Sequence, residues 1–242
     1  MRLPRPGLLL TVFILSLLCW VIYYLPARVL VARLPALHAG GAPLQLDQAN
    51  GSVWQAEAAW HWRGHDGQVS WKLRWHGLTP GVDVKVNGSG LDVAGWIAGN
   101  SHRLQLDGLR LTLPLALVLD GQRDVAADGV VSGRIASLLW QEGRIDALKG
   151  QLHYTGGNGR WRRQSAVLPV MDAQLSMTGK LAQVKVTDAN RVQLASVSVD
   201  AKQQLQLQVY RAFADAVGMS EGKGNSQDVI LKLTQPLASL AQ

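Results

Sequence analysis

The sequence predicts a mainly β protein, in which a single N-terminal transmembrane helix precedes a large curved antiparallel β-meander of half-barrel or sandwich-like form. Three observations lead to this prediction. Residues 7–25 carry no charge, apolar and polar residues alternate in short runs from residue 44 onward, and turn-forming residues separate these runs. Because the connections are short, successive strands are expected to be antiparallel neighbours.

The uncharged segment 7–25 has the length of a membrane span. As a helix it extends about 28 Å, close to the thickness of the hydrocarbon layer of a bilayer. Trp20, Tyr23 and Tyr24 stand at its C-terminal end, where interfacial aromatic residues are common, and Pro26 follows. The alternative is a cleaved signal peptide, but Pro26 and Arg28 occupy positions where a cleavage site has small residues. The sequence favours an uncleaved signal anchor.

The positive charge of the chain is concentrated beside this segment. Arg2 and Arg5 precede it, and Arg28 and Arg33 follow it. Without these four, 20 of the 24 Lys and Arg residues remain against 17 Asp and Glu, so the body has no footprint for nucleic acid. The flanking charges and the short tail predict a cytoplasmic N-terminus, with the C-terminal domain in the periplasm and the anchor in the inner membrane.

The body shows the two-residue period of half-buried strands. Residues 69–76 and 82–87 alternate around a predicted turn at 79–81, and 88–90 predicts the next turn or bulge. Gly108 interrupts another alternating run and predicts a bulge. Further strands are predicted at 102–113, 125–135, 144–154, 170–178, 181–187, 192–199 and 205–209. With about eleven strands, twist should make the sheet curl, split or close.

The predicted organisation has five parts. They are a cytoplasmic tail (1–6), the signal anchor (7–25), a juxtamembrane segment and linker (26–43), a periplasmic β-rich domain (44–219) and a flexible C-terminal segment (220–242). A helical turn is considered at 136–140, a short helix at 210–219 and a candidate last strand at 228–233.

No constellation of catalytic or metal-binding residues stands out. The only cysteine, Cys19, lies within the apolar segment, and the acidic residues are scattered singly. His61 and His65 have no third ligand at matching spacing, and residues 222–224 lack the remainder of a phosphate-binding loop. The sequence therefore predicts no enzyme, no cofactor and no metal site.

Two clusters are candidates for binding. Arg160, Arg162 and Arg163 form a basic patch in a glycine-rich turn, suited to lipid phosphates or an acidic partner, although a solvated loop is the simpler interpretation. Six tryptophans crowd the first half of the body. They favour a core, and the alternative is an apolar groove for an acyl chain or a partner strand. These tryptophans are Trp54, Trp60, Trp62, Trp71, Trp75 and Trp96.

One element resembles a known family. The run Gly51-Ser52-Val53-Trp54-Gln55-Ala56-Glu57-Ala58 is similar to the G-T-x-W-x-G-x-A element of the type II secretion system protein N family. Ser52 stands for the usual Thr and Ala56 for the usual Gly. The strand containing Trp71-Lys72-Leu73, followed by Gly88-Ser89-Gly90-Leu91, resembles the family's next strand and hairpin. Gly51, Ser52, Val53, Trp54, Ala58 and Trp71 are the candidate structural or partner-contact residues.

The resemblance implies a non-enzymatic accessory of the inner-membrane platform that exports folded proteins from the periplasm across the outer membrane. Its expected partners are other platform proteins and the outer-membrane secretin, with the bilayer contacted through the anchor. The alternative is a membrane-anchored periplasmic protein that binds or transfers lipid in an apolar β-groove. A hydrolase would require a convergent polar site, which the sequence does not contain.

Overall fold

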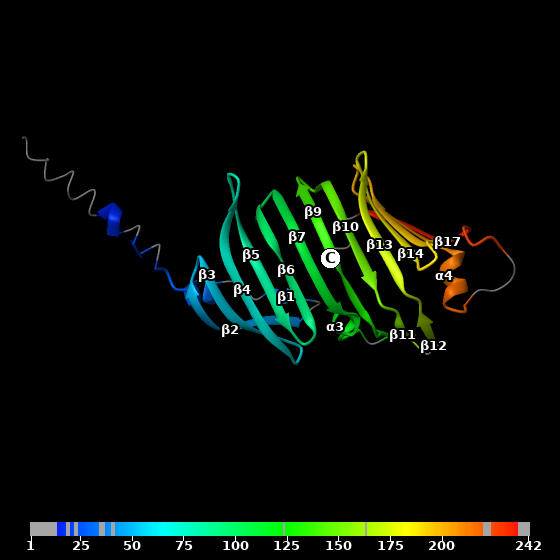
Figure 1. Ribbon diagram of the computed structural model, residues 1–242, viewed down its shortest axis with the longest axis horizontal. Coiled ribbons are helices and arrows are strands. Elements are labelled where there is room, and N and C mark those ends of the chain that lie inside the picture. Colours follow the sequence, from blue (N-terminus) through cyan, green and yellow to red (C-terminus); the bar gives the residue numbers. More distant parts are fainter. Residues whose placement is uncertain are drawn as a thin grey trace, which may run out of the picture.

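A single long sheet dominates the computed structural model, which describes residues 14–17, 20–21, 24–33, 37–39, 42–122, 124–162, 164–219 and 224–236 (Figure 1). Within these residues there are a 14-stranded sheet, a three-stranded sheet and three short helices that have described bounds. The sheet runs from the N-terminal strands at one end to the C-terminal strands at the other, so the order of the chain is the order across the sheet.

The first half of the sheet follows a short helix, α2 (Ala27–Arg33). Its strands are β1 (Leu37–Ala39), β2 (Ala42–Ser52), β3 (Gln55–Trp62), β4 (His65–His76), β5 (Thr79–Gly88), β6 (Leu91–Asn100) and β7 (Arg103–Pro114). Helix α3 (Leu115–Leu119) follows directly on β7.

The second half of the chain makes two detours from the meander. Its elements are β8 (Val125–Ala127), β9 (Val130–Gln141), β10 (Arg144–Tyr154), β11 (Gly157–Trp161), β12 (Gln164–Leu168), β13 (Met171–Thr178), β14 (Leu181–Asp188), β15 (Gln193–Val199), β16 (Gln204–Tyr210), α4 (Arg211–Ala216) and β17 (Val229–Pro236). Strands β8, β11 and β12 leave the main sheet and form the small one.

The predicted mainly β antiparallel meander is confirmed, and the sheet is open. Each strand pairs antiparallel with its neighbours, β1 and β17 form opposite ends of the sheet order, and no described pairing joins them. The expected short helix and last strand correspond to α4 and β17. Gly108 has a φ of 63° and coincides with a register shift opposite Ala94 and Trp96, so the predicted bulge is also confirmed.

Strand register sorts the side chains onto two faces. Val69 pairs with Val86, which in turn pairs with Val93, whereas Gln68 pairs with Asn87 on the opposite face. The same alternation persists in the second half, where Leu148, Leu175 and Ala182 form a buried cluster. The sheet therefore has one continuous apolar face and one largely polar face.

Some local predictions were wrong. Residues 79–81 begin β5 instead of forming the turn, which lies at Gly77 and Leu78. Gly81 allows the ring of Trp96 to pack directly against the backbone of β5, because a Cβ at this position would lie 2.4 Å from that ring. The helical turn considered at 136–140 is part of β9, which pairs on both sides. The single strand expected at 125–135 is divided between β8 and β9.

Tyr154 connects the main sheet to the small one. Its hydroxyl donates a hydrogen bond of 2.6 Å to the backbone oxygen of Asp128, in the connection between β8 and β9. Burial, and secondarily the negative charge of Asp128, raises the pKa of Tyr154 above its ordinary value. The phenol therefore remains a protonated hydrogen-bond donor at neutral pH.

The predicted N-terminal parts are described only in fragments. The tail 1–6 lies outside the described residues, and only 14–17, 20–21 and 24–25 of the predicted anchor lie within them. Among the described residues, the structure contains no helix with the length and apolar character to span a membrane. Residues 26–43, predicted as juxtamembrane segment and linker, hold α2, β1 and the start of β2.

Candidate functional site

A tight turn between β2 and β3 is formed by the family-like element. Gly51 has a φ of 108°, and a Cβ at this position would lie 2.5 Å from the backbone oxygen of Gln55 and 2.9 Å from the Cα of Ala56. The hydroxyl of Ser52 accepts a hydrogen bond of 3.3 Å from the amide of Gln55. A glycine followed by a hydroxyl residue therefore suits this turn, and threonine would supply the same oxygen as serine.

The turn fastens the start of α2 to the sheet. The amide of Val53 donates to the carbonyl of Leu25 over 2.9 Å, and Pro26 forms an isolated bridge with Ser52. Ala27, the first residue of α2, is fully buried. The indole nitrogen of Trp71 donates to the carbonyl of Val53 over 3.1 Å. The element thus joins three segments: the juxtamembrane chain, the β2–β3 turn and β4.

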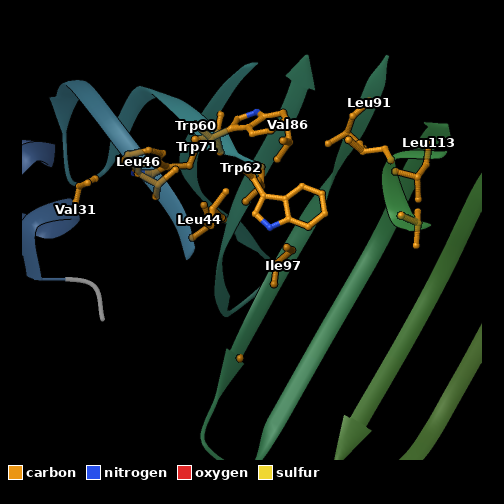
Figure 2. A pocket seen from close by; sticks show the side chains of 16 residues that line it. Val31, Leu44, Leu46, Trp60, Trp62, Trp71, Val86, Leu91, Ile97 and Leu113 are labelled. Atoms are coloured by element: carbon orange, nitrogen blue, oxygen red, sulfur yellow. The ribbon is translucent and has the colours of Figure 1, made fainter. Parts of the chain in front are cut away.

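An apolar groove of about 750 Å³ lies on the apolar face of the first half of the sheet (Figure 2). Figure 2 shows Val31 of α2 at one side of the groove and Leu91 and Leu113 at the other, with Trp62 between them. The lining residues are Val31, Leu44, Leu46, Trp60, Trp62, Val69, Trp71, Val82, Val84, Val86, Leu91, Ile97, Gly99, Leu113, Leu117 and Val118.

Two of the three indoles that line the groove have their N–H groups bonded to the protein backbone. Trp60 donates from Nε1 to the carbonyl of Asn87 over 3.1 Å, and Trp71 donates to Val53. Both rings can therefore present carbon atoms to the groove without leaving a buried N–H unpaired. Since no lining side chain is charged, the site suits hydrocarbon and offers little to a polar ligand.

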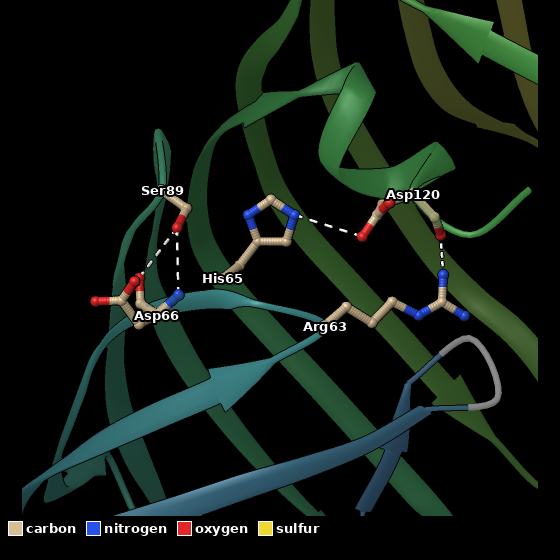
Figure 3. Close-up of polar contacts among 5 residues, drawn as sticks. All are labelled: Arg63, His65, Asp66, Ser89 and Asp120. Carbon is tan, nitrogen blue, oxygen red and sulfur yellow. Dashed lines mark hydrogen bonds and ion pairs between the residues drawn. The ribbon is translucent and has the colours of Figure 1, made fainter.

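Helix α3 is held over this face by a polar contact at the edge of the groove (Figure 3). The guanidinium of Arg63 donates to the backbone oxygen of Asp120, and Nε2 of His65 lies 3.5 Å from the Asp120 carboxylate. These side chains join the β3–β4 turn and the start of β4 to Asp120, the residue that directly follows α3. Leu117, on the same helix, is buried in the groove lining. The contact therefore helps to position one wall.

The tryptophan cluster separates into different sites. Trp60, Trp62 and Trp71 line the groove. Trp96 lies on the opposite face, where its ring stacks on His76 with centroids 4.3 Å apart. Trp75 is 61% exposed, so its expected place in the core was wrong. Sequence alternation predicted the apolar face of β4 and β5, which forms part of the groove wall, although a closed core was favoured over a groove. It gave no sign of Val31 and Val118, because their positions depend on how α2 and α3 pack.

The basic patch predicted from the sequence lies outside the groove lining. Arg160 is the penultimate residue of β11 in the β11–β12 hairpin and Arg162 lies in the turn, both exposed, whereas Arg163 lies outside the described residues. The predicted glycine-rich turn at this place is strand β11, in which Gly159 packs against Leu168.

His61 and His65 lie on different strands, β3 and β4. Within the described part of the chain, no group of three His, Cys, Asp or Glu residues is arranged to hold a metal.

Strand β17 is the C-terminal edge of the main sheet. It pairs with β16, and no other described strand pairs with its outer side. Four large apolar side chains on this strand are about half exposed: Val229, Ile230, Leu231 and Leu233. An edge of this kind presents unpaired backbone groups beside apolar side chains, which is the arrangement that accepts an added strand.

An open sheet with an apolar groove and an exposed apolar edge defines a binding scaffold. In the comparison with known families, the sequence matches the family described as type II secretion system (T2SS), protein N, over residues 42–240. The chain belongs to this family, and with it to the accessory components of type II secretion and protein transport in the cell envelope. Searches of curated proteins and of solved structures found no match.

Proposed function

We propose that this chain is a non-enzymatic accessory of the inner-membrane platform of the type II secretion system, acting through protein–protein contacts made by β17. In this proposal the domain is periplasmic and the segment 7–25 anchors it in the inner membrane. The partners are other platform proteins or the outer-membrane secretin, and the outcome is export of folded periplasmic proteins across the outer membrane.

The observation that carries the proposal is the open edge at β17. Natural sheets usually protect an apolar edge with charges, proline or a covering element. Here Lys232 is the only charged residue of the strand, and Pro236 stands at its very end. An edge strand left with exposed Val229, Ile230 and Leu231 is suited to β-augmentation, in which a partner strand adds main-chain hydrogen bonds. Tethering to a membrane would raise the local concentration of both partners, so that weak contacts suffice.

A charge placed on this edge should impair secretion. We expect Ile230→Lys to reduce export of a type II substrate by about tenfold, because an added strand would have to desolvate the new ammonium group. The side chain of Ile230 is already 50% exposed, so the domain should fold normally. Secreted substrate is measured in culture medium against substrate retained in the periplasm.

The matched control is Val167→Lys, which places the same charge on another exposed apolar residue. Val167 is 68% exposed and lies on β12 of the small sheet. We expect normal export from this variant. Equal export by the two variants, at equal protein levels, would rule out β17 as the functional edge.

A further inference from the structure

The apolar groove has the properties of a site for a hydrocarbon chain. Its volume of about 750 Å³ falls in the range of small-molecule sites, which is about 300–1,000 Å³. Its lining has only apolar residues, and the indole N–H groups of Trp60 and Trp71 are already bonded to backbone oxygens. An extended peptide would bury its amides without partners here, whereas an acyl chain has no polar groups to satisfy.

The length of the groove fits an acyl chain. Its lining extends from β2 to β7, which are five strand spacings apart, and this corresponds to about 24 Å across the sheet. One leaflet of a bilayer holds acyl chains of about 15 Å, half the thickness of the hydrocarbon layer. The groove can therefore take one extended chain across its floor.

One end of the groove adjoins the segment that leads to the predicted membrane anchor. Val31 of α2 lines this end, and it follows the uncharged stretch 7–25 by only six residues. Arg28, one helical turn before Val31, is exposed, and no acidic residue precedes Asp47 in the chain. The local charge is thus complementary to an anionic headgroup at a membrane surface.

We propose that the groove binds an acyl chain of an anionic membrane glycerophospholipid, which enters at the α2 end with its phosphate near Arg28. This inference goes beyond the proposed protein contacts, and it relies on the predicted insertion of residues 7–25. It assigns α2 and α3 to the two ends of one lipid site, with the indoles of Trp60, Trp62 and Trp71 in its walls.

The test uses the full chain reconstituted into vesicles of phosphatidylglycerol that carries a photoactivatable diazirine in one acyl chain. After irradiation, labelled peptides are mapped by mass spectrometry. We expect label in β3–β6 and in α3. Val118→Glu places a carboxylate in the lining at a side chain already 49% exposed, so folding should survive, and labelling should fall by about tenfold.

Two controls separate lipid binding from surface contact. Val167→Glu adds the same charge on β12 and should leave groove labelling unchanged. In mixed vesicles, Arg28→Gln should abolish the preference for phosphatidylglycerol over phosphatidylcholine, whereas Arg28→Lys should keep it. Circular dichroism checks that each variant retains its β signal.

The proposal would be overturned if no groove peptide carried label. It would also be overturned if the groove of Val118→Glu were labelled as strongly as that of the unmodified chain. Photo-crosslinks from groove residues to residues 237–242 of the same chain, or to a partner protein, would overturn it too, because another occupant would then fill the site. Lipid labelling that persists while Ile230→Lys has no effect on export would contradict the proposed function alone.

Discussion

Replacing Trp60 by alanine is expected to lower the free energy of unfolding by about 3–5 kcal/mol, the usual cost of truncating a buried large aromatic residue. Trp60 is only 4% exposed although it lines the apolar groove. Its ring packs against Gly67, where a Cβ would lie 2.7 Å from the indole, and its Nε1 bonds to Asn87. Chemical denaturation followed by far-ultraviolet circular dichroism measures the change.

Two comparisons identify the cause of that loss. Trp161→Ala removes the same side chain at a position that is 65% exposed, and should change stability by no more than about 0.5 kcal/mol. Trp60→Phe keeps a ring but loses the hydrogen bond to Asn87, and should cost about 1–3 kcal/mol. A similar loss in Trp60→Ala and Trp161→Ala would refute the assignment of Trp60 to the core of the first half.

Replacing Gly51 by alanine is expected to cost about 3–4 kcal/mol, because strained backbone and a steric clash act together. Its φ of 108° disfavours any residue with a Cβ, and the added methyl group would meet backbone atoms of Gln55 and Ala56. The turn cannot move freely, since Val53 is bonded to Leu25 and Trp71. The change is measured by chemical denaturation of the full chain in detergent.

Gly64→Ala provides a matched control for the clash. Gly64 has a φ of 81°, but a Cβ there would meet no atom within 4 Å, so only backbone strain of about 1–2 kcal/mol is expected. Gly51→Ala should also release the start of α2 and hasten trypsin cleavage after Arg28, unlike Gly64→Ala. Equal stability and equal cleavage in the two variants would show that the Gly51 turn does not hold the juxtamembrane segment.

The sequence predicted the class of fold because alternation and short turns are local signals. Residues 69–76 and 82–87 alternate, and the structure pairs Trp71 with Val84 on one face. Errors arose where glycine has a packing role. Gly81 lies beneath Trp96 and Gly159 packs on Leu168, so both belong to strands although glycine commonly marks turns.

The groove was only partly predictable for a different reason. The alternation in residues 69–76 and 82–87 predicts one buried face on β4 and on β5, and Trp71 and Val84 lie on that face. The ends of the groove depend on the packing of α2 and α3. The hydrogen bond between Arg63 and Asp120, which helps to position α3, also joins parts of the chain that are distant in sequence. Such contacts have no local pattern in a single sequence. The family-like element around Gly51 was found by resemblance, and its connection to Leu25 emerged only from the structure.

The most direct test of the proposed role is photo-crosslinking in living cells, with a photoreactive amino acid placed at Leu231 or Leu233 on β17. Lys85, on the polar face of β5, and Val167, on β12, provide control positions. The account predicts adducts to a platform protein or the secretin from β17 and none from the two controls. The absence of any secretion-system adduct from β17, or equal adducts from all four positions, would contradict it.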